Sequence, residues 1–125
     1  MGTSWDGESC RRIIEETGSE SLRIIFDPAN MFSNGLDPVV EAEKMKWDML
    51  SVQFKDFIKS NHETKYVLLS HGQVPVFQII NSLKKHKFDG YIVAEYEKWW
   101  HPELPNPLVG LRHELNYLKE SFRQI

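Results

Sequence analysis

The strongest hydrophobic periodicity in the chain follows Pro75. Four apolar residues recur there at the spacing that places side chains on one face of a helix: Val76, Ile79, Ile80 and Leu83. Proline suits the opening of a helix, because its fixed φ is already helical and the N–H it lacks would have no partner there. The pattern predicts an amphipathic helix that begins at Pro75 and buries this face.

Three other segments are predicted to be helices. The first covers about residues 9–17 and ends before Gly18, where a C-cap glycine belongs. The second begins with Pro38, after the capping residue Asp37, and runs to about Trp47. A closing helix follows a proline-rich loop, with apolar positions at Leu111, Leu115, Leu118 and Phe122.

Three apolar runs between these helices are predicted to be strands: residues 22–26, 50–54 and 91–97. Residues 55–69 are less clear, since "KSNHET" reads as a polar loop and "YVLLS" as either a short strand or an extended return into the core. Helices and strands alternate, with connections long enough for crossovers. We therefore expect an α/β fold with about three to four parallel strands and flanking helices.

Composition and charge limit the number of domains and the classes of partner that we expect. A length of 125 residues with 41% hydrophobic content suits a single domain over residues 1–125. The formal charge is −3 and no segment gathers Lys and Arg, so nucleic acid is not an expected partner. Cys10 is the only cysteine, which excludes an internal disulfide and fits a cytoplasmic protein. No apolar run approaches the roughly 18 residues of a membrane span, so no membrane partner is expected either.

Polar side chains follow each predicted strand near its C-terminal end. Alternate residues of a strand share a face, which puts Asp27, Gln53 and Glu95 on comparable faces of three strands, with Lys55 and Glu97 one pleat beyond. Parallel α/β folds bind ligands at this end of the sheet. Two carboxylates and a neutral oxygen suit Mg²⁺ or Mn²⁺, and can also share Zn²⁺.

Such a site favours one kind of chemistry. A metal ion polarises a carbonyl group while a carboxylate moves a proton on the adjacent carbon. The alternative interpretation is structural, because acids at strand ends also cap neighbouring helices or pair with Lys and Arg at the rim. Residue pattern alone leaves both interpretations open.

Several ordered motifs carry a resemblance to a known family. They are "RIIFDPANMF", "SVQFKDF" and "LLSHGQVPVFQIINSLKKHKFDGYIVAEYE", within a similarity that covers roughly residues 10–122. They resemble the closing segments of the xylose isomerase-like TIM-barrel family, the sugar phosphate isomerases and epimerases. The resemblance implies a partial TIM-barrel-like fold, a small sugar or sugar phosphate as ligand, and a divalent metal (Mn, Mg or Zn) as a possible cofactor.

The resemblance also implies roles for individual residues. Asp27 matches a metal-binding aspartate, and Glu95 matches a glutamate that binds metal and transfers a proton. Gln53 stands where the family usually has a metal-binding histidine, and an amide oxygen is a poorer ligand than imidazole for Mn²⁺ or Zn²⁺. Asn30 falls where family members place a histidine or asparagine that contacts substrate.

Three further residues are candidate substrate contacts. Lys55 would hold a hydroxyl or phosphate group at the rim, or is an ordinary solvated lysine. His71 lies where the family commonly carries Glu or another polar residue, and either binds substrate or is a surface histidine without a role. Trp99 begins the loop after the last strand, where it stacks on a sugar, covers the barrel end or contacts another subunit.

The predicted strands supply only part of a barrel. A complete (βα)₈ barrel needs about 250 residues and eight strands. By resemblance, the three strands here are the last three, and the family's other catalytic glutamate lies on a strand that this sequence lacks. Open strand edges invite pairing with another chain. We therefore expect a homo-oligomer or a missing N-terminal half as the partner.

Three functions follow from these expectations. The first is a sugar isomerase or epimerase that is active only when a partner completes the barrel. The second is a non-catalytic half-barrel module for binding or oligomerisation. A flavodoxin-like regulatory domain is disfavoured, because no glycine-rich loop follows the first strand. The abasic-site endonucleases, which share the barrel, are disfavoured by the acidic charge and the absent histidines.

Overall fold

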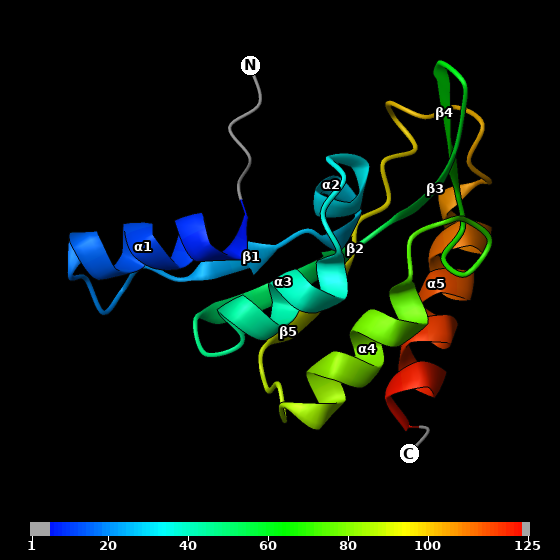
Figure 1. The fold of residues 1–125 in the computed structure, drawn as a ribbon. Coiled ribbons are helices and arrows are strands. Elements are labelled where there is room, and N and C mark those ends of the chain that lie inside the picture. The colour runs from blue at the N-terminus through cyan, green and yellow to red at the C-terminus, as the bar shows by residue number, and fades with distance from the viewer. Residues whose placement is uncertain (1–5, 124–125) are drawn as a thin grey trace.

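Ten helices and strands follow one another in the computed structural model, which describes residues 6–123 (Figure 1). In chain order they are α1 (Gly7–Thr17), β1 (Ile24–Phe26), α2 (Pro28–Ser33), α3 (Pro38–Met45), β2 (Met49–Phe54), β3 (Asp56–Ser60), β4 (Glu63–Val67), α4 (Val76–Lys85), β5 (Tyr91–Ala94) and α5 (Pro107–Arg123). Among these helices none combines the length and apolar character that crossing a membrane requires.

The central sheet has three parallel strands in the order β1-β2-β5. Ser51 of β2 pairs with Ile25 of β1 on one side and with Tyr91 of β5 on the other. Helices occupy the connections, so the predicted α/β fold with parallel strands and flanking helices is confirmed. All three strands end at the same edge of the sheet, as parallel strands must.

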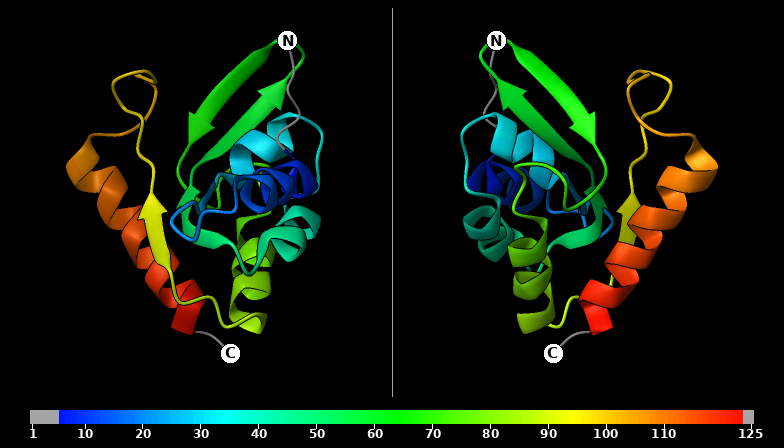
Figure 2. Two further views of the ribbon diagram at one scale, coloured as in Figure 1. Left: turned by 90° about the vertical axis from the view of Figure 1, so that its left-hand side faces the viewer. Right: turned by 90° about the vertical axis from the view of Figure 1, so that its right-hand side faces the viewer.

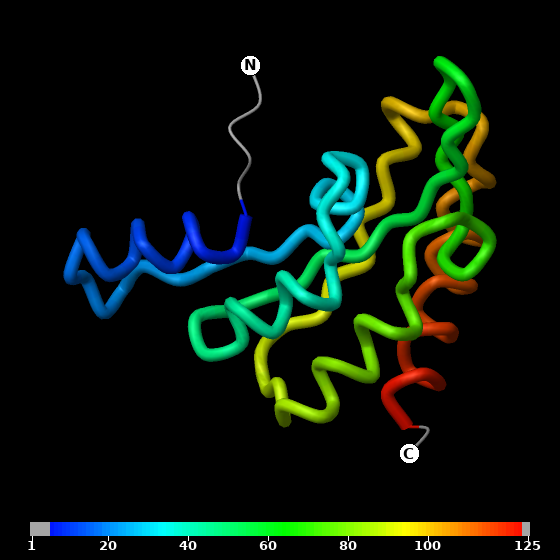
Figure 3. Tube along the Cα trace, viewed as in Figure 1, coloured from blue at the N-terminus to red at the C-terminus, as the bar shows by residue number. Residues whose placement is uncertain are grey.

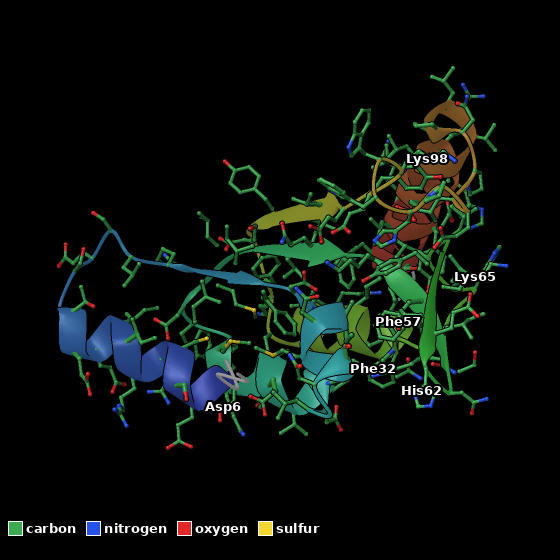
Figure 4. The ribbon with its side chains drawn as sticks, turned by 90° about the horizontal axis from the view of Figure 1, so that it is seen from above. Asp6, Phe32, Phe57, His62, Lys65 and Lys98 are labelled. Atoms are coloured by element: carbon green, nitrogen blue, oxygen red, sulfur yellow. The ribbon has the colours of Figure 1, made fainter. Side chains whose placement is uncertain are left out.

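The two faces of this sheet differ sharply in burial. Phe26, Val52 and Phe54 point to the covered face and have no exposed surface. Figure 4 shows α1, α2 and α3 on one side of the sheet, and Leu118 of α5 belongs to the same core. On the opposite face, Ile25 and Tyr91 keep 61% and 70% of their surface exposed. In a closed barrel this second face would be the interior.

Local sequence signals set the helix ends. The Asp6 side chain accepts from the Ser9 N–H at the start of α1, and Gly18 ends that helix with φ +66°. Asp37 caps α3, with Pro38 at its first position as predicted. The structure adds one helix that the residue pattern did not predict, because "DPAN" opens α2 directly after β1.

The segment after Lys55 also differs from the prediction. Residues 55–69 contain an antiparallel hairpin, β3 and β4, which takes in most of "KSNHET", where a polar loop was expected, and the start of "YVLLS", where a short strand was one of two possibilities. The hairpin projects from the body of the molecule (Figure 2). It is anchored at its base, where the Phe57 ring contacts Phe32 of α2 and Tyr66 of β4 (Figure 4). The sheet of three parallel strands confirms the prediction of three to four, and the hairpin adds two antiparallel strands.

Candidate functional site

A buried lysine lies among three carboxylates at the C-terminal edge of the sheet. Lys55 Nζ is 3.1 Å from Asp27 Oδ2, 3.0 Å from Glu95 Oε2 and 3.2 Å from Glu97 Oε1. The contacts to Glu95 and Glu97 are hydrogen bonds that Lys55 donates. We call these four residues the Lys55 cluster. Only 8% of the Lys55 side chain is exposed, so the ammonium group has exchanged almost all of its water for carboxylate oxygens.

Parallel pairing explains why the cluster forms. Asp27 directly follows the last residue of β1, Lys55 the last residue of β2, and Glu95 the last residue of β5. The Glu95 N–H donates to the Phe54 carbonyl at 2.9 Å, which extends the ladder and sets Glu95 beside Lys55. Residues separated by more than sixty positions therefore meet at one edge. The predicted convergence of Asp27 and Glu95 is what the structure shows.

Asp27 has a second task in this site. It caps α2, since its Oδ1 accepts from the Asn30 backbone N–H at 3.0 Å. Its Oδ2 accepts from the Asn30 side-chain amide at 2.8 Å and also contacts Lys55. Both contacts are those of the structural interpretation of an acid at a strand end, because Asp27 caps a helix and pairs with a lysine. Asn30 thereby borders the cluster, and its predicted contact with substrate stays a prediction.

An aromatic pair adjoins the cluster on the side of the hairpin. His101 Nε2 lies 3.1 Å from Glu97 Oε2. The Tyr66 ring stacks on His101, with 3.7 Å between ring centroids, and the Tyr66 N–H donates to Glu103. Figure 3 traces the segment after β5 past the hairpin that carries Tyr66. The hairpin thus holds the loop that carries Glu97 and His101.

The same loop is closed by a lysine. Lys98 Nζ donates to the carbonyl oxygens of Pro102 and Leu104, each at 2.6 Å (Figure 4). Trp99, next in the chain, is 86% exposed and Trp100 is 72% exposed. Neither indole is packed against the core, so the structure leaves Trp99 available at the surface, and its predicted contact with a sugar or another subunit stays a prediction.

The pKa values of the Glu95 and Glu97 carboxyl groups are shifted in opposite directions. Burial raises the pKa of Glu95 and outweighs the hydrogen bond and positive charge of Lys55, which lower it, while the negative charges of Asp27 and Glu97 add a smaller rise. Burial also acts to raise the pKa of Glu97, but hydrogen bonds from Lys55 and His101 outweigh it and the pKa lies below its usual value. Burial acts to lower the Lys55 pKa, yet Glu95 and Asp27 raise it above its ordinary value. Lys55 is therefore a permanent cation.

The side chains present do not fit the metal site that the resemblance implies. Of its expected ligands, Asp27 and Glu95 come together, but Lys55 lies between them. Gln53 is on the same face of the sheet, opposite Val93 in the register. Within residues 6–123, no group of three or more His, Cys, Asp or Glu side chains is arranged to hold a metal ion.

His71 contacts α5. Its ring meets His113 of α5 edge-on, with centroids 5.0 Å apart. The loop that carries it is fixed by Asp56, whose carboxylate accepts from the backbone N–H groups of Gly72 and Val74. Asp56 therefore organises the loop before α4, while its neighbour Lys55 points into the cluster. The predicted contact of His71 with substrate stays a prediction.

A cavity of about 500 Å³ opens beside the cluster. Asp27 and Asn30 are in its wall, together with Ile25 of β1 and Cys10 of α1. The cavity lies at the β1 edge of the sheet, which carries no further strand in residues 6–123. It provides room for a small polar molecule next to Asp27.

The sequence placed Glu97 one pleat beyond Glu95 without giving it a role, and it gave no indication of Tyr66. The alternation of Glu95 and Glu97 was a usable signal, because residues two apart on an extended chain share a face. Nothing comparable pointed to Tyr66, whose role depends on a hairpin that the residue pattern did not reveal.

Comparison with known proteins agrees with this geometry. The family described as xylose isomerase-like TIM barrel matches residues 1–121. Two solved structures share the fold: a xylose isomerase domain protein from Planctomyces limnophilus (TM-score 0.75, 19% identity) and the probable 3-DHS dehydratase AsbF, involved in petrobactin synthesis, from Bacillus anthracis (TM-score 0.74, 19% identity).

The match covers nearly all of this chain but less than half of the others. It takes in 98% of this chain and 46% of the Planctomyces chain, and 91% of this chain and 44% of the Bacillus chain. No match is found among curated proteins. The sheet of three parallel strands is thus part of a barrel, and the chain belongs to the xylose isomerase-like TIM barrel family.

Proposed function

We propose that the Lys55 cluster is part of an active site for proton transfer next to the carbonyl group of a sugar or sugar phosphate, the reaction of an isomerase or epimerase. One observation carries the proposal: a single ammonium group bridges Glu95 and Glu97 at the strand ends, 3.0 and 3.2 Å away. A base and a fixed positive charge are the two groups that this reaction needs side by side.

Each group has a role that follows from its surroundings. Glu95 in its ionised form takes the proton from the carbon next to the carbonyl, and the electron pair of the broken C–H bond moves onto the carbonyl oxygen. Lys55 exchanges one of its carboxylate contacts for a hydrogen bond to that oxygen as its negative charge develops. In an isomerase, Glu95 returns its proton to the former carbonyl carbon while the hydroxyl proton of the first carbon moves to the former carbonyl oxygen, so that the hydroxyl oxygen becomes the new carbonyl. In an epimerase, a second carboxyl group from the part that completes the barrel supplies a proton to the opposite face of the same carbon, and Glu95 keeps the proton that it took.

The pKa values support this division of roles. A pKa raised by burial makes Glu95 a stronger proton acceptor than an ordinary carboxylate. A lowered pKa keeps Glu97 ionised, so that it holds Lys55 and His101 in place. Neighbouring carboxyl groups whose pKa values are pushed apart are a common sign of separate acid–base assignments.

The proposed enzyme needs more strands than this chain supplies. The chain spans 46% and 44% of the two solved structures, so we propose that a second copy or an N-terminal half completes the site. A non-catalytic half-barrel module is the second candidate function. It is favoured by the exposed apolar face around Ile25 and Tyr91, which suits association whether or not catalysis occurs.

Solvent exchange tests the proposal directly. Fructose 6-phosphate is incubated with the protein in D₂O, and replacement of the C1 protons by deuterium is followed by NMR. Glu95→Gln is expected to slow the exchange at least about 100-fold, the usual contribution of a positioned general base. Glu63→Gln, in the exposed hairpin strand β4, is the matched control and should leave the rate unchanged. Equal rates for wild type and Glu95→Gln would contradict the proposal, and no exchange by the associated wild-type protein would favour the non-catalytic module.

A further inference from the structure

We propose that the Lys55 ammonium group is the resident cation of this carboxylate cluster and takes the place of a divalent metal ion. The resemblance implied a metal at this edge of the sheet. The side chains of this chain instead surround a positive charge that is covalently attached to β2. The inference goes beyond the proposed function, because it concerns what holds the site together and not which reaction occurs there.

The number of donors matches the number of acceptors. A lysine ammonium group has three N–H donors and no acceptor. Three carboxylates each direct one oxygen at it, at distances between 3.0 and 3.2 Å. The ammonium group is therefore saturated by Asp27, Glu95 and Glu97, and the carboxylates are drawn to one point as they would be around a metal ion.

Burial prevents Lys55 and a divalent metal ion from occupying the cluster together. The exposed fractions of the side chains are 8% for Lys55, 13% for Asp27, 28% for Glu95 and 24% for Glu97. A divalent ion bound to the same oxygens would lie within a few ångströms of the ammonium group, where like charges repel strongly because little water screens them. Lys55 would have to leave its buried position before a metal could enter.

The donor set also suits an ammonium group better than a metal ion. Both oxygens of Asp27 already accept hydrogen bonds from Asn30, in the cap of α2. An ammonium contact tolerates this sharing, since it needs only one lone pair, whereas a metal requires closer approach and fixed coordination geometry. Gln53, in place of the imidazole expected by resemblance, adds only a neutral amide oxygen.

One ammonium group does not neutralise three carboxylates, and the neighbours make up part of the difference. His101 contacts Glu97 at 3.1 Å and adds positive charge whenever it is protonated. Groups of this chain therefore offset part of the negative charge of the cluster.

A metal titration without substrate tests the inference. Wild-type protein is titrated with MnCl₂ in a calorimeter beside Lys55→Met, which removes the charge and keeps the stem, and Lys59→Met, an exposed lysine of β3, as the control. We expect wild type and Lys59→Met to bind Mn²⁺ no tighter than about 1 mM, and Lys55→Met to bind it at least about tenfold tighter. A wild-type Kd in the micromolar range, or a folded Lys55→Met that gains nothing, would overturn the inference.

Circular dichroism establishes whether Lys55→Met is folded. Because three uncompensated carboxylates can prevent folding, the double variant Lys55→Met with Glu97→Gln repeats the titration with less repulsion. The wild-type melting temperature in EDTA and in 1 mM MnCl₂ gives an independent readout: equal values agree with the inference, and a clear rise with Mn²⁺ contradicts it. Since no sugar is present, this result and the D₂O exchange result can differ, and each identifies which proposal has failed.

Discussion

Glu114 is a carboxyl group buried under the loop that precedes α4. Its residue is 2% exposed, and within the part of the chain that the structure describes its Oε2 has no hydrogen-bond partner. Burial, with a further contribution from the charge of Asp56, raises the pKa of Glu114 to about 7. The folded protein therefore holds a proton there that the unfolded chain releases above its ordinary pKa of 4.5.

This difference predicts that stability falls as pH rises. Between pH 4.5 and 7 the folded state binds more protons than the unfolded state, so the contribution of Glu114 is fully present below that window and is lost above it. We expect Glu114→Gln to remove this dependence and to raise the free energy of unfolding by about 2 kcal/mol at pH 8. Urea melts at pH 5 and pH 8 measure it.

Glu120→Gln is the control for this prediction, because Glu120 is on the same helix, exposed and paired with Arg123. It should keep the pH dependence of wild type. A Glu114→Gln protein that loses stability between pH 5 and pH 8 as steeply as wild type would show that another group titrates in this range.

At the scale of elements, the loop between β4 and α4 is fixed by close backbone approach to Asp56. A Cβ at Gly72 would lie 2.2 Å from Asp56 Oδ1 and 2.5 Å from the Phe57 carbonyl oxygen. We expect Gly72→Ala to cost about 2 kcal/mol of stability, since the loop or the start of β3 must move. Thermal unfolding with two-state analysis measures the loss.

Gly18→Ala serves as the comparison for Gly72→Ala. Gly18 has φ +66° with nothing within 4 Å of an added Cβ, so its cost is conformational only, about 1 kcal/mol. Only Gly72→Ala should also shift the amide NMR signals of Val74, which donates to Asp56. Unchanged Val74 signals would mean that the contact is relieved without moving the loop.

Elements whose apolar residues recur at a regular spacing could be predicted from sequence, and elements without such a spacing could not. α4 was predicted from its apolar positions, of which Val76, Ile79 and Ile80 are at most 2% exposed. The hairpin β3–β4 was missed because most of its residues, including Glu63 and Lys65, are exposed and polar, so no alternation marks two faces. It is held instead by Phe57, whose partners are distant in sequence.

The candidate site also contains residues that could be predicted from sequence and residues that could not. Asp27 and Glu95 could be predicted because parallel strands bring their C-terminal ends together. The central position of Lys55 depends on how far a long side chain reaches, which residue spacing does not specify. His101 and Tyr66 meet only because the hairpin stands beside the loop after β5.

On the scale of the whole molecule, the uncovered sheet face predicts association. Ile25, Tyr91 and Val93 are 61%, 70% and 39% exposed on strands whose outer edges carry no partner in residues 6–123. We expect a second copy of the chain to cover this face, giving a species of twice the 14.7 kDa mass in sedimentation equilibrium.

Charge on the sheet face should weaken this association. Tyr91→Lys is expected to raise the dissociation constant at least about tenfold, whereas Phe77→Lys, an exposed apolar residue of α4 outside the sheet, should not. A monomer for wild type at high concentration would exclude the second copy and leave an N-terminal half as the partner that completes the barrel.

Asp27 lies between the Lys55 cluster and the cavity, so it connects binding at one to binding at the other. Its carboxylate contacts Lys55 in the cluster, caps α2 through Asn30, and also forms part of the wall of the 500 Å³ cavity. A molecule that draws Lys55 toward itself releases Asp27, and a molecule in the cavity that engages Asp27 releases Lys55. The two occupancies are thermodynamically linked through one carboxylate, and each must change the affinity for the other by the same factor.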